Sequence, residues 1–314
     1  MGHDPTRKAG NVSAAGTART LASVAATDTG RGTSRLMLPV ADDLARAASM
    51  ILGSAPNLRV GILTGFFIPR AQPPAAETDG PLGAVQIASL INALGGTATL
   101  ISDSRCAPFI EGFIEGARSL GAGWRRPELL SVDDPEQIDL DVTHVVSIER
   151  PGRTADGSYR NMFAVDISEF CPPLDDWFDK TMAPKIAIGD GGNEVGMGRL
   201  DSRLVAEVID QGAVVRSVVS ADALIVAGTS NWGAHALCAA ILGSSPQSSG
   251  QGCLSEAWCK SVLEAGVSAG AVDGVSAARS LSVDGLPWDE YWEVPRRLNQ
   301  IAIASANEAP ASPR

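Results

Sequence analysis

Five short runs of apolar residues, spread along the chain, limit its fold more than any other feature of the sequence. Each run has the length of a β-strand, and the segments between the runs are long enough to hold helices. Strands that are apolar along their whole length are typical of parallel sheets, because helices cover both faces of such sheets. The sequence therefore predicts one large α/β domain with a mostly parallel, doubly wound sheet flanked by helices. The predicted strands are residues 59–65, 97–102, 143–148, 185–188 and 223–227.

Apolar residues at helical spacing predict the helices that flank these strands. Pro81 suits the first position of one helix, and Gly95 and Gly96 suit its end. Right-handed crossovers then bring the carboxyl ends of all the strands to one edge of the sheet, where α/β sheets bind their ligands. The predicted helices are residues 39–52, 81–94, 108–120, 199–210, 231–242, 254–265 and 288–304.

The two ends of the chain differ in composition from the predicted domain, which covers residues 35–304. Residues 1–34 are rich in Ala, Ser, Thr, Gly and Arg and have no apolar signal core, which predicts a disordered leader. Residues 305–314 are predicted to form a disordered tail. We expect a cytoplasmic protein. The arginines and scarce acids of the leader make the mitochondrial matrix the alternative.

The charge balance argues against nucleic acid as a partner. The chain has 36 Asp and Glu against 25 Lys and Arg, a formal charge of −11 at pH 7. It has no basic run that would neutralise phosphates. No apolar stretch reaches the roughly 18 to 20 residues that a membrane-spanning helix needs, so no membrane partner is expected either. The expected partner is a small acidic molecule, and the sequence leaves formation of a homo-oligomer open.

Cysteines and histidines give no sign of a zinc site. The five cysteines form no C-x-x-C pair and stand in apolar surroundings, which predicts reduced core residues. The chain has only three histidines, and we expect His235 to be a core or wall residue. Any metal ion would therefore be held by oxygen ligands.

A glycine-rich turn follows the fourth predicted strand, within residues 185–198 (KIAIGDGGNEVGMG). Glycine tolerates positive φ and lets the backbone approach a ligand closely. Asp190, Asn193 and Glu194 stand on this turn, at the end of a strand where α/β sheets place their chemistry. The alternative is a tight loop that carries solvated acids.

Polar residues also follow the first, third and fifth predicted strands. Because parallel strands end at the same edge of the sheet, we expect these residues and the glycine-rich turn to line one cleft. The free N–H groups at the start of the helix after the fifth strand would suit an anionic substrate. The candidate substrate-binding residues are Thr64, Arg150, Arg153, Asn161, Asn193, Thr229, Ser230 and Asn231.

Several of these residues also have structural interpretations, which the sequence leaves open. Asp79 would favour the dipole of the helix that begins near Pro81. Glu149 and Arg150 would form a local ion pair, and the polar residues after the fifth strand would cap the next helix.

A group of acids in one cleft predicts a divalent cation. Carboxylates that lie close together repel one another unless they are protonated or neutralised, and Mg²⁺ or Mn²⁺ would neutralise them. The chain has no G-x-x-x-x-G-K-[ST] motif and no G-x-G-x-x-G motif in the glycine-rich turn, so no nucleotide cofactor is expected. Arg150 and Arg153 are the predicted clamps for a substrate carboxylate or phosphate. The candidate metal ligands are Glu77, Asp79, Glu149, Asp190 and Glu194, and the last four are also the candidate catalytic residues.

Together these segments resemble the D-glutamate cyclase family. The similarity is to the domain that forms the carboxyl-terminal part of its longer mitochondrial members and stands alone in many bacteria. The resemblance implies conversion of D-glutamate to 5-oxo-D-proline with loss of water. The similar blocks are residues 64–66 (TGF), 77–81 (ETDGP), 148–152 (IERPG) with 156–157 (DG) and 161–162 (NM), 188–198 (IGDGGNEVGMG) and 227–233 (AGTSNWG).

Three functions are consistent with these observations. The first is a D-glutamate cyclase-like hydro-lyase, in which a metal held by Asp190, Glu194 and Glu77 polarises the substrate γ-carboxylate. Glu149 or Asp79 would then transfer the protons. The second is a Mn²⁺- or Mg²⁺-dependent phosphohydrolase that uses the same acids on a small phosphomonoester. The third is a non-catalytic module that binds a metal ion or an amino acid.

Overall fold

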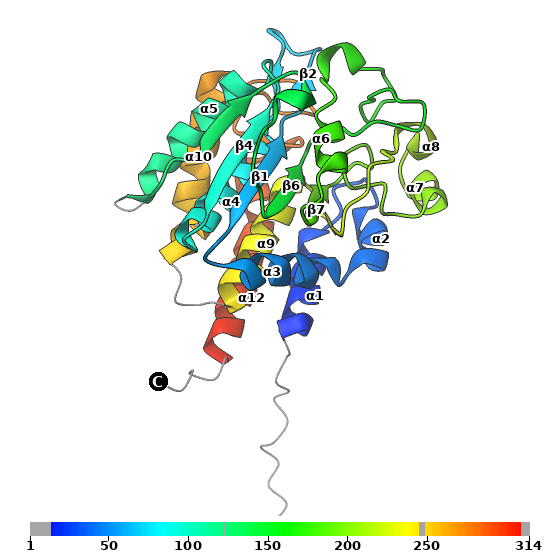
Figure 1. Cartoon of the computed structure of the whole chain (residues 1–314). Helices are drawn as coiled ribbons and strands as arrows, with labels where there is room; N and C mark the ends of the chain where they lie inside the picture. The colour runs from blue at the N-terminus through cyan, green and yellow to red at the C-terminus, as the bar shows by residue number, and fades with distance from the viewer. Residues whose placement is uncertain (1–13, 122–123, 245–248, 309–314) are drawn as a thin grey trace, which may run out of the picture.

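A six-stranded parallel sheet forms the centre of the molecule (Figure 1). The computed structural model describes residues 14–121, 124–244 and 249–308. The strand order is β5-β4-β1-β6-β7-β8, and every neighbouring pair is parallel. The predicted parallel, doubly wound α/β fold is confirmed. The strands are β1 (Arg59–Thr64), β4 (Thr97–Ser102), β5 (Glu128–Ser131), β6 (His144–Ile148), β7 (Lys185–Gly189) and β8 (Ala223–Val226).

The strand order reverses between β1 and β6. From β1 the chain moves outward through β4 to β5, and it then returns to the other side of β1 as β6. The loops after β1 and β6 therefore diverge, which leaves a crevice at the carboxyl ends of these strands. The sequence analysis missed β5, because this four-residue edge strand is only partly buried and lacks a continuous apolar run.

Helices cover both faces of the sheet. On one face α4 (Pro81–Ala93) packs against α9 (Ser230–Ser244), and α6 (Asp175–Lys180) lies on the other face. Two glycines allow this close packing. A Cβ at Gly83 of α4 would lie 2.7 Å from a side chain of α9, and a Cβ at Gly61 of β1 would lie 2.7 Å from a tryptophan of α6. Because both faces are covered, the strands are apolar throughout.

The other predicted helices are present, with ends shifted by a few residues. The segment predicted as one helix over residues 288–304 contains two helices. The helix predicted over residues 199–210 is shorter than predicted, because its first residues form a turn. Two short antiparallel hairpins, β2 with β3 and β9 with β10, lie outside the main sheet. The remaining elements are α3 (Asp43–Ser54), α5 (Ala107–Gly116), α7 (Ser202–Val208), α8 (Gly212–Val215), α10 (Glu256–Ala269), α11 (Trp288–Tyr291), α12 (Glu293–Glu308), β2 (Phe67–Ile68), β3 (Ala75–Ala76), β9 (Ser282–Val283), β10 (Leu286–Pro287) and the 3₁₀ helices η1 (Leu38–Val40), η2 (Ala117–Leu120), η3 (Pro135–Gln137), η4 (Ser168–Phe170) and η5 (Ser249–Leu254).

The segment predicted as a disordered leader contains ordered structure. Residues 14–25 form α1 (Ala14–Ala25), and α2 (Thr33–Met37) follows. Alanine favours helix strongly, and the buried side chains of α1, such as Leu21, pack against α9 and α12. The composition of this segment did not indicate a packed helix, because the buried face of α1 consists mainly of small residues. Residues 1–13 and 309–314 lie outside the described part, and residues 305–308 of the predicted tail continue α12.

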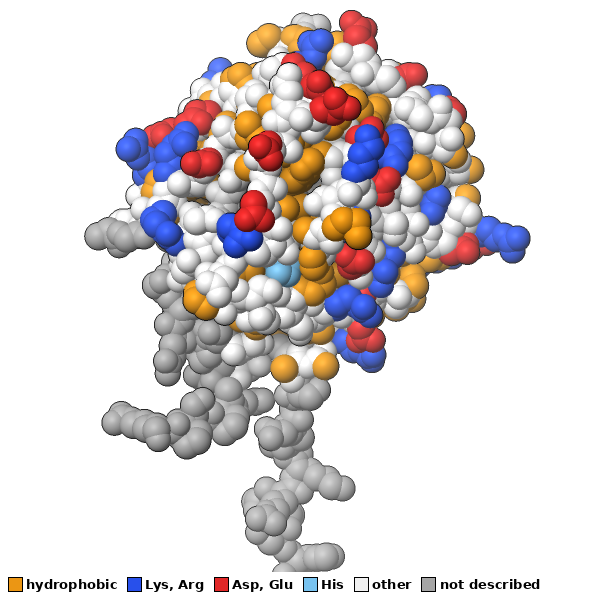
Figure 2. Space-filling view, in the orientation of Figure 1, with side chains coloured by type: hydrophobic (Ala, Val, Ile, Leu, Met, Phe, Trp, Pro, Cys, Tyr) orange, Lys and Arg blue, Asp and Glu red, His pale blue; other side chains and the backbone are white. Residues whose placement is uncertain are grey.

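The cysteines and His235 are core residues, as their sequence surroundings predict. Acidic and basic side chains are interspersed on the face shown in Figure 2. Within the described ranges, no helix has both the length and the apolar character to cross a membrane. All five cysteines are buried free thiols. His235 is a buried core residue, hydrogen-bonded to Gln86 (2.9 Å) and Asn299 (2.8 Å), and burial lowers its pKa to about 4.

Candidate active site

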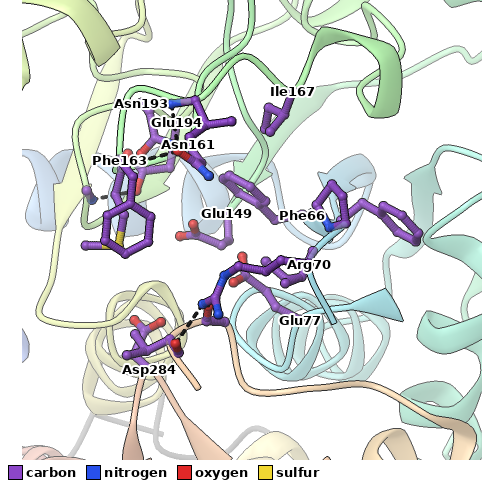
Figure 3. Close-up of a pocket in the computed structure, with 18 of the residues that line it drawn as sticks. Phe66, Arg70, Glu77, Glu149, Asn161, Phe163, Ile167, Asn193, Glu194 and Asp284 are labelled. Atoms are coloured by element: carbon purple, nitrogen blue, oxygen red, sulfur yellow. Dashed lines mark hydrogen bonds between the residues drawn. The ribbon is translucent and has the colours of Figure 1, made fainter. Parts of the chain in front are cut away.

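A cavity of about 390 Å³ lies at the carboxyl ends of β1, β6 and β7, beside the point where the strand order reverses. Buried acids line its inner part, and partly exposed apolar side chains line its mouth (Figure 3). This is the edge of the sheet at which the sequence predicted the site. The carboxylates that line the cavity are Glu77, Glu149, Asp190, Glu194, Asp284 and the exposed Asp166.

Glu149 follows the last residue of β6 and points into the cavity (Figure 3). Its backbone has a φ of 45°, a left-handed conformation that is uncommon for residues other than glycine and concentrates at functional sites. Ser230 at the start of α9 donates its hydroxyl to Glu149 Oε2 at 2.6 Å. Burial raises the pKa of Glu149 well above its usual value, and the nearby Glu194 and Glu77 raise it further. Glu149 is therefore a strained, protonatable acid at the centre of the site.

The glycine-rich turn after β7 shapes the second group of acids. Glu194 folds back over the turn, and its Oε1 accepts the backbone N–H groups of Asp190 (3.0 Å) and Gly191 (2.5 Å). A Cβ at Gly189 would lie 3.1 Å from Glu194 Cδ, so this glycine makes room for the carboxylate. The other oxygen of Glu194, Oε2, is buried and has no hydrogen-bond partner within the described residues. The turn thus presents a free carboxylate oxygen to the cavity.

Glu77 reaches the same cavity from the hairpin after β1. Its backbone N–H donates to Phe66 O at 3.0 Å, and Gly274 approaches its carboxylate so closely that a Cβ there would lie 2.0 Å from Oε2. Glu77 Oε1 is buried without a hydrogen-bond partner in the described chain. Burial raises the pKa of Glu77 well above its usual value, and Asp284 and Asp79 add to the shift. Glu77 is the second buried acid that is open to a ligand.

The acids fit a divalent cation. One oxygen each of Glu149, Asp190 and Glu194 lie within 4.8 Å of one another, and Asp79, Asp190 and Asp284 form a second such group. Mg²⁺ and Mn²⁺ prefer carboxylate oxygens, and the unpartnered Oε2 of Glu194 would gain a ligand bond in the first group. Glu77 belongs to neither group among the described residues.

Arg31 is a site residue that the sequence analysis missed. It lines the cavity, and its Nη1 lies 2.6 Å from Asp190 Oδ2 and 3.1 Å from Asp284 Oδ2. Asp28 holds the segment in place by accepting the N–H groups of residues 30, 31 and 32 at 2.8–2.9 Å. Burial by itself would lower the pKa of Arg31, but the carboxylates of Asp190 and Asp284 raise it well above its usual value. Arg31 thus remains a cation inside the acidic cavity.

Asp284, the other missed residue, occupies the turn between β9 and β10 with a φ of 52°. The dipeptide Asp284-Gly285 is a typical hairpin turn, and this signal was available in the sequence. The sequence did not show that this turn belongs to the site, because only the tertiary fold brings the hairpin beside the carboxyl end of β7.

Arg70 supplies a second positive charge at the cavity. Its Nη2 donates to the carbonyl oxygens of Gly274 (2.7 Å) and Val275 (2.6 Å). It forms no ion pair with any carboxylate of the described residues. Backbone carbonyls therefore hold this guanidinium at the cavity while its charge stays available to an anion.

Comparisons with known proteins give the family of the chain. The sequence model of the family described as "D-glutamate cyclase-like, C-terminal" matches residues 21–299. The chain belongs to this family. It is also 35% identical over 253 residues to human "D-glutamate cyclase, mitochondrial", a match that covers 74% of this chain and 39% of the human protein. The chain thus spans well under half of the length of that relative. The family match includes the last five residues of α1 and Arg31, so residues 21–34 of the predicted leader belong to the D-glutamate cyclase-like domain.

The structure corrects the roles predicted for Arg150 and Arg153, because neither lines the cavity. Arg150 is fully buried in an ion pair with Asp103, and it donates to Gly65 O (3.2 Å) and Pro172 O (2.6 Å). Arg153 pairs with three acids of α6, among them Asp175 at 3.0 Å. Both guanidinium groups hold loops together in this D-glutamate cyclase-like domain, outside the lining of the cavity. The predicted local pair between Glu149 and Arg150 is also absent from the ion pairs of the described residues.

Asp79 and Asn231 cap helices, but not the helices that the sequence suggested: Asp79 caps α9 instead of the helix near Pro81, and Asn231 caps α4 instead of its own helix. Both oxygens of Asp79 accept backbone N–H groups at the start of α9, from Ser230 (2.7 Å) and Asn231 (2.8 Å). In return Asn231 Oδ1 accepts N–H groups at the start of α4, from Gly80 (3.0 Å) and Gly83 (2.8 Å). The two helices therefore cap each other's amino-terminal ends, which satisfies donors that would otherwise be left without partners.

The other candidates divide between the cavity and its supports. Asn161 and Asn193 line the cavity; Asn161 Oδ1 accepts N–H groups of its own loop, and Asn193 Nδ2 donates to Arg160 O at 2.9 Å. Thr64 Oγ1 is buried without a hydrogen-bond partner in the described chain. Thr229 Oγ1 accepts the N–H group of α9 three residues later, at 3.3 Å, so it is a helix cap.

The buried acids predict a specific dependence of stability on pH. The folded-state pKa values of Glu77, Asp79, Glu149 and Asp190 are raised, so their contribution to stability is complete below about pH 4 and is lost as the pH rises through the raised values. Above about pH 7.5, where histidines are almost entirely neutral in both states, we expect the free energy of unfolding of the chelator-treated protein to fall as the pH rises through the raised values. Urea unfolding at several pH values measures this slope. A flat or rising profile in that range would contradict the expected burial of these acids.

Proposed function

We propose that this chain is a hydro-lyase that converts D-glutamate to 5-oxo-D-proline and water. The observation that carries the proposal is the set of buried carboxylates with unpartnered oxygens around one cavity, in a member of the D-glutamate cyclase-like family. In this reaction the α-amine nitrogen bonds to the γ-carbon, a γ-carbon–oxygen bond breaks, and the oxygen leaves as water. The site must neutralise the γ-carboxylate, remove protons from the amine and protonate the departing oxygen.

Glu149, Asp190 and Glu194 would hold a divalent cation, with Mg²⁺ or Mn²⁺ as the candidates. Such an ion supplies positive charge that makes the γ-carboxylate a better electrophile. Asp190 and Glu194 are shaped for this by the glycine-rich turn, and Glu149 by its hydrogen bond from Ser230. We therefore assign these three acids to ion binding.

Glu77 is the best placed group for proton transfer. The sequence analysis assigned this role to Glu149 or Asp79, but both oxygens of Asp79 accept backbone N–H groups. Glu77 lines the cavity, has an unpartnered oxygen and lies outside both cation groups of the described residues. Its raised pKa suits a group that takes a proton from the amine and returns one to the departing oxygen near neutral pH.

Arg31 and Arg70 would hold the substrate. Arg70, whose charge no carboxylate of the described residues neutralises, suits the α-carboxylate, and Arg31 offsets the charge of the acids. Because the reaction is intramolecular, a site that holds the substrate in a bent shape brings nucleophile and electrophile together and lowers the barrier.

The direct test is to incubate the purified protein with D-glutamate and to detect 5-oxo-D-proline by chiral chromatography and mass spectrometry. We expect product with Mg²⁺ or Mn²⁺, little product after treatment with a chelator, and little product from L-glutamate. If no 5-oxoproline forms with either ion, the proposal is wrong. The same assay separates this function from a non-catalytic binding module.

The phosphohydrolase alternative has less support. Arg150 and Arg153, which would have bound the phosphoryl oxygens, pair with acids away from the cavity. A phosphomonoester would also bring more negative charge than glutamate to a cavity lined by six carboxylates. The human relative is named as a mitochondrial protein. For this chain, the cytoplasm and the mitochondrial matrix stay alternative predictions. Formation of a homo-oligomer also stays a prediction.

Replacing Arg31 tests its assignment. We expect Arg31→Met to raise KM for D-glutamate by about tenfold or more, because the anionic substrate would then meet the acids of the cavity without the compensating charge of Arg31, and one charge-assisted contact contributes about 1.5–3 kcal/mol. Arg31→Lys should restore part of the loss. Arg35→Met is the matched control, since the side chain of Arg35 is 58% exposed and its nearest carboxylate is 3.9 Å away. Equal KM values for Arg31→Met and the unchanged protein would remove Arg31 from the site.

A further inference from the structure

The mouth of the cavity has an apolar wall that D-glutamate does not explain. Three of the eight large apolar residues that are exposed in the described structure lie here: Phe163 (60% exposed), Val165 (55%) and Val275 (41%). Phe66 and Ile167 continue the wall toward the buried acids (Figure 3). Exposed apolar residues that gather in one place mark a binding surface.

The wall is built as part of the site. Asn161 Oδ1 accepts the N–H groups of Phe163 (3.0 Å) and Val165 (3.1 Å), so one side chain of the cavity holds the loop that carries both residues. On the opposite side Arg70 holds the carbonyl oxygen of Val275. Figure 3 shows Phe163 and Phe66 on either side of Glu149.

The charge of the cavity is a second, independent reason to consider substrates other than D-glutamate. Six carboxylates and two guanidinium groups line the cavity. Where these acids are ionised and no cation is bound, a free γ-carboxylate enters against an excess of negative charge, and a carboxylate is in any case a poor electrophile. A γ-amide carries no charge at the reacting carbon and accepts nucleophiles more readily. The same cavity therefore favours a neutral γ-carbonyl group.

We propose, building on the function above, that the preferred substrates are γ-amides of D-glutamate whose amine part is apolar and lies against the wall of Phe163 and Val165. The α-amine must stay free to react, and the α-carboxylate is assigned to Arg70. Only the γ-substituent can therefore extend to the mouth. The substrate class is a γ-D-glutamyl amide of an apolar amine.

The reaction balances without an additional reactant. The α-amine nitrogen bonds to the γ-carbonyl carbon, and the γ-carbon–nitrogen bond of the amide breaks. The two protons that the α-ammonium group gives up both end on the departing amine, and Glu77 is the group placed to pass them. The products are 5-oxo-D-proline and a free ammonium compound, and no water is consumed or formed.

The test compares two amides with similar leaving groups, γ-D-glutamyl-phenethylamide and γ-D-glutamyl-methylamide, together with D-glutamate. We expect kcat/KM for the phenethylamide to exceed that for the methylamide at least tenfold, because apolar groups in such pockets change kcat/KM by about 10- to 200-fold. Phe163→Ser should lower this ratio by about tenfold. Met182→Ser is the control, since Met182 is 96% exposed and does not line the cavity.

The outcomes separate the two proposals. If D-glutamate reacts but the two amides react equally, or neither amide reacts, the substrate class is wrong and the proposed function stands. If the phenethylamide reacts in preference and Phe163→Ser removes the preference, the substrate class is supported even where D-glutamate reacts slowly. If none of the three compounds yields 5-oxo-D-proline, both proposals fail. Thermal unfolding of Phe163→Ser confirms that the variant is folded.

Discussion

Replacing Glu77 with glutamine is expected to lower kcat for 5-oxo-D-proline formation by about 10²- to 10⁴-fold, the usual contribution of a group that transfers protons. Glutamine has nearly the same shape but cannot exchange a proton. The same change should raise the Tm of the metal-free protein, because it removes an acid whose pKa burial and the neighbouring acids raise well above its usual value. Activity and stability would then move in opposite directions, which excludes unfolding as the cause of the loss.

Glu136→Gln is the matched control for this experiment. Glu136 is exposed in η3, away from the cavity, and its replacement should change neither kcat nor Tm. Steady-state kinetics and thermal unfolding with and without chelator give all the required values. A Glu77→Gln variant that keeps more than a tenth of the original kcat would assign proton transfer to another acid, with Glu149 as the next candidate.

Arg150→Met is expected to lower the free energy of unfolding by about 3–5 kcal/mol, the typical result of breaking a buried ion pair on one side. The change leaves the buried carboxylate of Asp103 without its cation, and the carbonyl oxygens of Gly65 and Pro172 lose their donor. Because these contacts tie the loops after β1 and β6 together, the crevice that holds the site would loosen as well.

Urea unfolding of three variants tests this role for Arg150. The double variant Arg150→Met with Asp103→Asn should be more stable than Arg150→Met alone, because it no longer buries an unpaired charge. Arg296→Met is the control; its ion pair with Glu293 is 2.6 Å long but exposed, so the change should stay within about 0.5 kcal/mol. A loss below about 1 kcal/mol for Arg150→Met would show that the pair does not hold the loops.

Local patterns in the sequence were sufficient to predict most of the fold and the edge of the sheet that carries the site. The buried strands are apolar throughout, and the glycines of the turn after β7 are needed to place Glu194. Both features can therefore be recognised as local patterns in the sequence. The sequence patterns of the strand β5 and the helix α1 are weaker, and the sequence analysis missed both elements. One is a short, partly buried edge strand, and the other buries mainly small side chains.

The direction of each side chain was harder to predict. Arg150 follows Glu149 directly, yet Glu149 lines the cavity and Arg150 pairs with Asp103 outside it. Neighbouring residues at the end of a strand point in different directions, and sequence spacing does not show which one meets the ligand. The sequence analysis assigned Asp79 to the site because sequence spacing does not show the direction of its side chain, which in the structure caps α9.

The sequence by itself determined the class of fold, the acidic character of the site and the strand ends that supply Glu149, Asp190 and Glu194, because these depend on local composition and periodicity. Only the tertiary structure decided which charges share the cavity. Arg31 precedes the first strand, and Asp284 lies in a hairpin far along the chain, yet Arg31 contacts both Asp190 and Asp284. Such contacts arise from the packing of α1 and of the β9–β10 hairpin around the sheet, which no local pattern encodes.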